Sequence, residues 1–186
     1  MVLPGRMSGL VQSKIDGDGV LLRPWQAADR AAVRAGYADP DIQRWHCVSM
    51  TDDEAREWID SWSDRWCKET GAGWAVVDVA GMGEVVGQIS LCRLNLHEGL
   101  AEVSYWVLPA ARGRGVASRA LSSVTSWSFA ELGLHRIEVC HSTMNPVSYG
   151  VARRAGFTAE GTKRGEIRHA DGWHDMHIHA RLDTDE

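Results

Sequence analysis

The 186-residue chain has a hydrophobic fraction of 44%, a charged fraction of 24% and a formal net charge of −5 at pH 7. These values are ordinary for one globular domain with a sizeable core. The acidic balance argues against a general nucleic-acid-binding protein, whose affinity rests on a basic surface. No apolar run approaches the ~20 residues that a membrane-spanning helix needs, so neither nucleic acid nor a membrane is expected as a partner.

The N-terminal segment and the cysteines indicate where the protein resides. Lys14, Asp16 and Asp18 occupy positions where a signal peptide would need apolar residues. Because the segment has no periodic pattern, we expect a flexible leader at residues 1–18, followed by a single domain at residues 19–183. The four cysteines lie far apart without a CxxC pair, which favours reduced thiols and predicts a cytoplasmic protein.

Strand and helix patterns alternate through the first half of the chain. Asp39-Pro40-Asp41 predicts a break between elements in this half and precedes an expected loop at residues 44–47. Thr51 and Glu54 form a capping-box pattern that predicts the start of a helix. The expected elements are a strand at 20–23, a helix at 26–37, a helix from 51 to about 68, and strands at 74–79 and 85–91 that flank a turn at 80–83.

The second half predicts a strand–helix–strand passage followed by a helix and a hairpin. Asn145-Pro146 marks a helix start, with an N-cap and a proline at the first helical position. The expected elements are strands at 100–108, 135–141, 157–167 and 173–182, and helices at 114–132 and 145–156. This order predicts a mixed α/β fold, with a parallel crossover around the helix at 114–132.

The most informative segment is the turn Arg112-Gly113-Arg114-Gly115-Val116-Ala117, which joins a predicted strand to a predicted helix. Two glycines let bare backbone N–H groups approach an anion, and the N-terminus of the helix adds partial positive charge. The segment therefore predicts a ligand that bears phosphate.

Three phosphate-binding chemistries can be compared at this turn. A P-loop is disfavoured because no Lys-Ser or Lys-Thr follows the glycines. A dinucleotide fold needs GxGxxG in an early βαβ unit, with an acidic residue on the next strand. Residues 113–118 match the glycine motif in part, and Glu138 stands near the expected position of the acidic residue. However, the motif follows 110 residues of chain, and too little chain remains to complete a doubly wound sheet. Coenzyme A is the third possibility.

Three motifs in order resemble the GNAT superfamily of acyltransferases over roughly residues 20–183. Arg112, Gly115 and Ala117 match its Gln/Arg-x-x-Gly-x-Gly/Ala motif, and Asn145-x-x-Ser148 leading into Arg-Ala-Gly-Phe at 154–157 resembles a second block. Residues 173–181 resemble the last strand of the RimJ/RimL branch, the ribosomal-protein N-terminal acetyltransferases. The resemblance implies a mixed, mostly antiparallel twisted sheet of about six to seven strands flanked by about four helices.

The resemblance also implies a coenzyme A site, with acetyl-CoA as the expected co-substrate and another short acyl-CoA as an alternative donor. Backbone N–H groups of residues 113–117 would hold the pyrophosphate, and two arginines would add charge to it. The pantetheine arm would pair with the strand at 100–108, which should therefore splay from the strand at 135–141. The implied cofactor-binding residues are Trp106, Val107, Leu108, Arg112, Gly113, Arg114, Gly115, Val116, Ala117 and Asn145.

Acyl transfer to an amine needs a neutral nucleophile and a stabilised oxyanion. A free α-amine has a pKa of about 8 and lysine about 10.4, so a base must act at neutral pH. Glu102 stands near a position where the family often has a basic Glu, and we expect it to act directly or through water; a structural carboxylate is the alternative. The Val107 N–H is the expected oxyanion donor.

The departing thiolate benefits from a proton donor. Much of the superfamily has a Tyr seven residues after the Asn of the second block, but this position is Ala152. The RimJ/RimL branch likewise lacks this Tyr and carries a Ser at the place of Ser148. We therefore expect Ser148 to act on the thiolate, with a simple capping hydroxyl as the alternative.

The acceptor side of the site is less defined. Trp45 and His46, in the expected loop before the capped helix, are the predicted acceptor contacts. His177 and His179 share one strand face, but no Cys or carboxylate at ligand spacing completes a metal site. His179 stands where the RimJ/RimL ending commonly has Tyr. We expect no metal.

The sequence thus predicts an acyl-CoA-dependent N-acyltransferase, most simply an acetyltransferase. It would transfer the acyl group directly to a primary amine, either a protein N-terminus or a small-molecule amine. A non-catalytic acyl-CoA sensor and a dinucleotide-binding protein stay open as alternatives. A homodimer is a mild expectation from the family.

Overall fold

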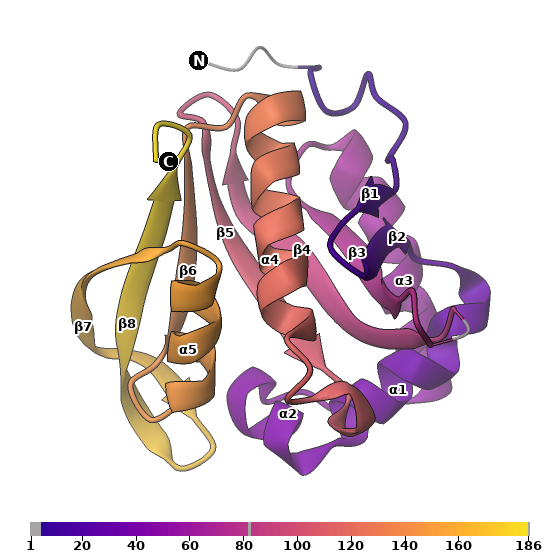
Figure 1. Ribbon diagram of the computed structural model, residues 1–186. Coiled ribbons are helices and arrows are strands. Elements are labelled where there is room, and N and C mark those ends of the chain that lie inside the picture. Colours follow the sequence, from indigo (N-terminus) through magenta and orange to yellow (C-terminus); the bar gives the residue numbers. More distant parts are fainter. Residues whose placement is uncertain (1–4, 82, 186) are drawn as a thin grey trace.

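A computed structural model describes residues 5–81 and 83–185, which form one eight-stranded sheet with the order β1-β2-β3-β4-β5-β6-β8-β7 (Figure 1). Helices α1 to α5 and a π-helical turn, Ser128–Leu132, pack around it. The strands are β1 (Ile15–Asp16), β2 (Val20–Pro24), β3 (Ala72–Asp78), β4 (Val85–Asn95), β5 (Leu100–Val107), β6 (Arg136–Ser142), β7 (Thr158–His169) and β8 (Gly172–Leu182), and the helices are α1 (Arg30–Ala38), α2 (Pro40–His46), α3 (Asp52–Cys67), α4 (Val116–Trp127) and α5 (Pro146–Arg154).

The strands pair antiparallel except at β5 and β6, which are parallel. These two strands pair through three positions, and the last pair is Glu102 with Glu138. Beyond this pair both strands continue, to Val107 and Ser142, but within the described residues they no longer pair with each other. The predicted splay between the two strands is therefore confirmed.

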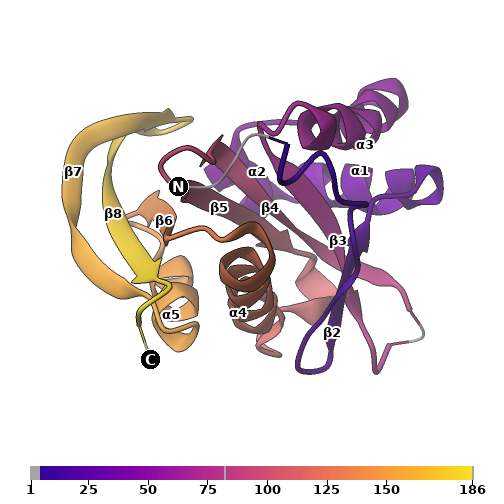
Figure 2. The same cartoon turned by 90° about the horizontal axis from the view of Figure 1, so that it is seen from above.

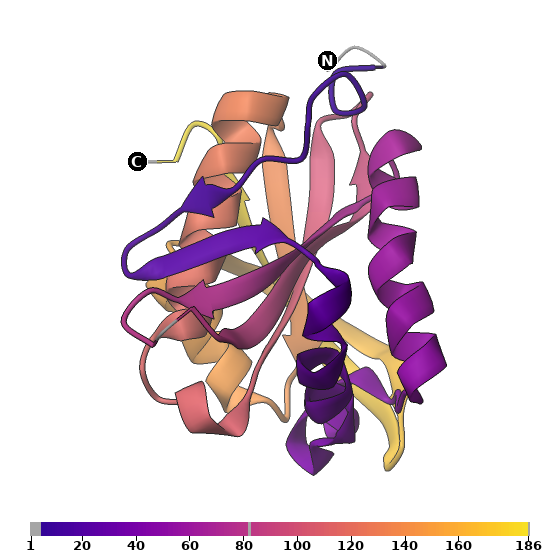
Figure 3. The same cartoon turned by 90° about the vertical axis from the view of Figure 1, so that its right-hand side faces the viewer.

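Helices cover both faces of the sheet. Figures 2 and 3 show α4 and α5 on one face and α1 and α3 on the other. Leu121 and Val124 of α4 belong to a buried cluster with Val103 of β5 and Ile137 of β6. On the opposite face, Trp106 of β5 packs in a second cluster that includes Val33, Tyr37, Ile42, Ala55 and Ile59. Helices thus pack against both faces of the sheet around β5.

The described part of the expected leader, residues 5–18, is packed against the domain, which corrects the prediction of a flexible segment. The Met7 side chain is fully buried, and Ile15 pairs with Leu22 across β1 and β2. The Glu69 carboxylate accepts the Met7 N–H at 2.8 Å. Isolated apolar side chains that fill a distant core leave no periodic signal. Residues 1–4 lie outside the described residues.

The segment expected as a loop at residues 44–47 is instead the end of helix α2. The Asp39 side chain accepts the Ile42 N–H at 3.0 Å, and Pro40 occupies the first helical position. These are ordinary helix-start signals, but the helix is too short to show a period. With α2 and β1 added, residues 5–81 and 83–185 form eight strands and five α-helices, one strand and one helix beyond the about six to seven strands and about four helices expected.

The remaining elements follow the sequence pattern. The capping box of Thr51 and Glu54 starts α3, and Trp62 and Trp66 on that helix are buried in the core. The hairpin of β7 and β8 is antiparallel, as predicted. The turn at 80–83 contains residue 82, which lies outside the described residues. Across the described ranges, no helix is both long and apolar enough to span a bilayer.

Candidate active site

The glycine turn adopts a conformation that exposes its backbone at the start of α4. Gly113 and Gly115 both have positive φ, +73° and +74°, a region that side-chain-bearing residues rarely occupy. Gly115 is also the N-cap of α4 and has no side chain to cap the helix. The first N–H groups of a helix have no partner within it, so this turn presents donors and positive potential to an anion.

The two arginines of the turn are engaged by carboxylates. Arg112 contacts Asp39 and Asp41 of the α2 start, and its Nε donates to the Val107 carbonyl at 3.1 Å. Arg114 pairs with the buried carboxylate of Asp78. These ion pairs fix the turn to α2 and to β3, while both guanidinium groups remain partly exposed.

A cleft of about 580 Å³ opens where β5 and β6 part. Its walls come from α2, β5, the start of α4, β6, the start of α5 and β7. Nine of the site residues predicted from sequence line it: Trp45, His46, Glu102, Trp106, Val107, Arg112, Ala117, Asn145 and Ser148. The structure thus brings together the candidate catalytic, cofactor and acceptor residues; Leu108, Gly113, Arg114, Gly115 and Val116 belong to the adjoining turn and helix start.

Only every second residue of β5 directs its backbone N–H and C=O groups into the cleft. The Leu108 N–H donates to the Val86 carbonyl at 2.8 Å, so it points toward β4. Because alternate residues of a strand direct their N–H and C=O groups to opposite edges, Tyr105 and Val107 present theirs to the gap. The Tyr105 carbonyl lies 3.3 Å from His46 Nε2. The backbone groups of Trp106 and Leu108 therefore serve the β4 pairing, and Val107 is the predicted residue whose N–H faces the cleft.

Ser148 lies in the first turn of α5, next to a tyrosine that the sequence did not single out. Its backbone N–H donates to Asn145 Oδ1 at 3.0 Å, so Asn145 is the N-cap of α5. The Ser148 and Tyr105 hydroxyls lie 3.1 Å apart. Burial raises the pKa of Tyr105 to about 12, so this phenol keeps its proton near neutral pH.

Glu102 is the last residue of β5 to pair with β6, and its carboxylate therefore lies where the cleft begins. Its side chain is 18% exposed, and Oε2 lies 3.2 Å from Arg93. Burial raises the pKa of Glu102, and Arg93 opposes the shift. A partly desolvated carboxylate with a raised pKa is a stronger base than an exposed one.

Trp45 and His46 reach the cleft from the last turn of α2. Burial lowers the pKa of His46, which keeps the imidazole neutral, with Nε2–H donating to the Tyr105 carbonyl. The Trp45 ring packs edge-on against His169 and His174 of the β7–β8 hairpin. Neither histidine was predicted from sequence as part of the site, because each is brought there by the curl of the hairpin.

His177 and His179 do share one face, where they pack with His141 and Tyr149. No group of three His, Cys, Asp or Glu side chains within residues 5–81 and 83–185 has the arrangement of a metal site. This cluster packs against α5, outside the residues that line the cleft except for His141.

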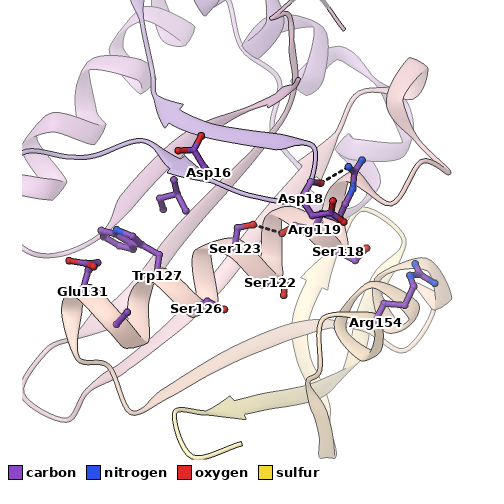
Figure 4. Close-up of a pocket in the computed structure, with 12 residues that line it drawn as sticks. Asp16, Asp18, Ser118, Arg119, Ser122, Ser123, Ser126, Trp127, Glu131 and Arg154 are labelled. Carbon is purple, nitrogen blue, oxygen red and sulfur yellow. Dashed lines mark hydrogen bonds between the residues drawn. The ribbon is translucent and has the colours of Figure 1, made fainter. Parts of the chain in front are cut away.

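A second hollow lies on the outer face of α4, on the side away from the sheet. Figure 4 shows its serines, Arg119 and Arg154, with Arg119 hydrogen-bonded to the Asp18 carbonyl. None of the predicted site residues lines this hollow. The chemistry-bearing side chains gather instead in the cleft between β5 and β6.

Comparisons with known proteins agree with this geometry. Residues 20–158 match the family model described as an acetyltransferase (GNAT) domain.

Two curated relatives have acetyltransferase names. The E. coli ribosomal-protein-serine acetyltransferase is 34% identical over 101 residues, covering 53% of this chain and 55% of the relative. The uncharacterized N-acetyltransferase YoaA of Bacillus subtilis is 26% identical over 152 residues, covering 81% of this chain and 85% of the relative. The match spans about half the length of several curated relatives.

Among solved structures, Mycobacterium smegmatis RimJ, in complex with a CoA disulfide, superposes with a TM-score of 0.79 at 23% identity. The superposition covers 91% of this chain and 86% of RimJ. The chain therefore belongs to the GNAT family of acetyltransferases.

Proposed function

We propose that this protein transfers an acetyl group from acetyl-CoA directly to a primary amine, with another short acyl-CoA as an alternative donor. One observation carries the proposal: β5 and β6 stop pairing at Glu102 and Glu138, and an anion-binding helix start stands at the mouth of the gap. A strand-like pantetheine arm fits along the edge of β5 from which β6 has separated, and the pyrophosphate fits at the Gly113–Ala117 turn.

Binding of the diphosphate rests on the backbone of this turn. Arg112 and Arg114 already face Asp39, Asp41 and Asp78, so much of their charge is offset. Their main contribution is to hold the turn open, with added positive charge as a smaller effect. The N–H groups of residues 113–117 supply the direct contacts.

The chemical step follows from the side chains around the cleft. Glu102, with its raised pKa, removes a proton from the acceptor ammonium, directly or through water. The Val107 N–H stabilises the oxyanion of the tetrahedral intermediate. Ser148, polarised by the Tyr105 hydroxyl at 3.1 Å, delivers a proton to the departing thiolate. No covalent enzyme intermediate is needed.

The acceptor is proposed from two features. Trp45 and His46 line the cleft beside the hairpin of β7 and β8, and they offer an aromatic wall to an extended chain. Two of the similar proteins carry ribosomal-protein or RimJ names, which supports a protein N-terminus as acceptor. A small-molecule amine is the second candidate.

The test is acetyl-CoA-dependent thiol release against a panel of peptides with free N-termini, polyamines and amino sugars. We expect turnover with at least one amine, and a loss of about 10²–10⁴-fold in kcat in Glu102→Gln and Ser148→Ala. Glu57→Gln, on the exposed face of α3, is the matched charge control. Binding of acetyl-CoA without turnover across the panel would instead favour a sensor.

A thermal-shift comparison tests the alternative that the protein binds a dinucleotide. Because a ligand that binds only the folded state raises the melting temperature, acetyl-CoA should raise it more than NAD does. The reverse order would revive the dinucleotide hypothesis.

A further inference from the structure

A hydroxyl, an imidazole and a carboxylate form a continuous hydrogen-bonded chain at one side of the cleft. Ser142 Oγ, at the end of β6, lies 2.8 Å from His174 Nδ1. His174 Nε2, on β8, lies 2.8 Å from Asp171 Oδ1 in the turn between β7 and β8. Asp171 and His174 are three residues apart across the hairpin turn, whereas Ser142 is 32 residues from His174 in the chain.

The hydrogen-bond partners select one tautomer of His174. An ionised carboxylate only accepts hydrogen bonds, so Nε2 carries the proton that faces Asp171. Although burial opposes it, hydrogen bonds from its own backbone and from His174 lower the pKa of Asp171. Nδ1 is then the acceptor for the Ser142 hydroxyl. The Met144 N–H donates to Ser142 Oγ at 3.1 Å, which leaves the hydroxyl proton free to point at Nδ1.

The chain of groups runs from the cleft to solvent. Ser142 lines the cleft and is 2% exposed, His174 is 5% exposed, and the Asp171 side chain is 46% exposed. The titratable neighbours are His169, whose ring centroid lies 4.4 Å from that of His174, and Arg44, 3.8 Å from Asp171 Oδ2. Burial and His174 lower the pKa of His169, which keeps this neighbour neutral.

Acetyl transfer from a thioester requires two protons to leave the acceptor nitrogen. An amine that arrives as an ammonium loses one proton before it attacks the carbonyl carbon. When the C–N bond has formed and the C–S bond breaks, the nitrogen loses a second proton, while the thiolate gains one from Ser148. Glu102 holds one proton at a time and is largely enclosed, so the second proton needs another acceptor in the cleft until the products leave.

We propose that Ser142, His174 and Asp171 form a proton relay that accepts the second proton of the acceptor nitrogen and holds it on His174. The proton moves from the nitrogen to Ser142 Oγ while the hydroxyl proton moves to His174 Nδ1. Nε2 keeps its proton, and the Asp171 carboxylate stabilises the resulting imidazolium. After the products leave, the Nδ1 proton returns through Ser142 to the cleft. One of the two stored protons then restores the Ser148 hydroxyl and the other passes to water, so that each group regains its starting state. This inference rests on the proposed acetyl transfer to an amine.

The decisive variant is Asp171→Asn, because it removes the carboxylate that stabilises the protonated ring, and its amide can donate to Nε2 and so place the ring proton on Nδ1, where it blocks the hydroxyl. We expect kcat with the best acceptor of the panel to fall about tenfold or more near pH 7, with the Kd for acetyl-CoA unchanged. The deficit should shrink above the pKa of the acceptor amine, where only one proton must leave. Ser142→Ala should give the same pH dependence.

The matched control is Asp183→Asn. Asp183 Oδ1 lies 2.8 Å from His135 Nδ1 and is 41% exposed, so it forms a comparable His–Asp pair that does not line the cleft. This variant should keep wild-type kcat at every pH. A structural role for Asp171 would instead give a deficit that is independent of pH, and this result would overturn the relay.

A measurement without turnover separates the relay from the proposed function. Long-range ¹H–¹⁵N spectra of the histidine rings should show His174 protonated at Nε2 in the wild type and at Nδ1 in Asp171→Asn. The opposite tautomer in the wild type, or a covalent acetyl adduct on Ser142 by mass spectrometry, would overturn the relay even if amines are acetylated. Absence of any amine turnover by a protein with the expected tautomer would refute the proposed function and the relay with it.

Discussion

Acidification should destabilise the protein through one buried histidine. His179 is fully buried, its ring stacks on that of His141 with centroids 5.1 Å apart, and neither of its nitrogens has a hydrogen-bond partner in the described residues. Burial, followed by the nearby His141, His177 and Arg153, lowers the pKa of His179 from 6.5 to about 4. The folded protein therefore holds this ring neutral at a pH where the unfolded chain protonates it.

The size of the effect follows from this pKa difference. The difference between a pKa of 6.5 in the unfolded chain and about 4 in the folded protein corresponds to about 3 kcal/mol in the free energy of unfolding. Because the unfolded state binds the proton more tightly, this stability is complete above pH 6.5 and is lost as the pH falls from 6.5 toward 4. His141, whose pKa is also lowered by burial, acts in the same direction.

The assay is urea unfolding at pH 7.5 and pH 4.5 of the wild type and of His179→Phe, which keeps an aromatic ring but cannot be protonated. We expect the wild type to lose about 2–3 kcal/mol more than the variant between the two pH values. His97→Gln, in the loop between β4 and β5, should lose as much as the wild type. An equal loss in the wild type and in His179→Phe would refute the reasoning.

Three further predictions concern packing and the site. In Gly73→Ala the new Cβ would lie 2.4 Å from the Trp62 ring, so denaturant unfolding should show that the free energy of unfolding falls by about 1–3 kcal/mol. Gly161→Ala, whose Cβ meets nothing within 4 Å, is the control and should change this free energy little. Tyr105→Phe removes the hydroxyl that faces Ser148 and should lower kcat about tenfold without weakening acetyl-CoA binding; a wild-type kcat would exclude a role for this hydroxyl. Because the pKa of Glu102 is raised, kcat/KM should rise with pH as this carboxyl ionises, above the range of an ordinary Glu, and this limb of the pH profile should vanish in Glu102→Gln.

The sequence predicted most elements of the fold because their signals are local. The capping box at Thr51, the Asn145-Pro146 helix start and the hairpin turn near Gly172 each depend on a few neighbouring residues, and each is present in the structure. The packing of Met7 against the core and the helix at Pro40–His46 were missed. The first is a long-range contact, and the second is a helix of two turns with no room for a period.

The candidate site was predicted in part. The Gly113–Ala117 turn and the splay of β5 from β6 follow from motifs, whereas the ion pairs of Arg112 and Arg114 with acids of α2 and β3 come from the tertiary fold. Tyr105, Ser142 and His174 were not recognised, since each gains its role from a partner far away in the chain. The cytoplasmic location, the acceptor and a homodimer stay predictions.

The central claim is that the gap between β5 and β6 receives acetyl-CoA with its pyrophosphate at the start of α4. Isothermal titration calorimetry of the wild type and Ala117→Glu tests it directly, because a carboxylate in the first turn suits the helix dipole but repels phosphate. Ala35→Glu, on the exposed face of α1, is the charge-matched control. We expect saturable 1:1 binding in the wild type and in Ala35→Glu, and at least about tenfold weaker binding in Ala117→Glu. No binding by the wild type, or equal affinity in all three proteins, would contradict the account.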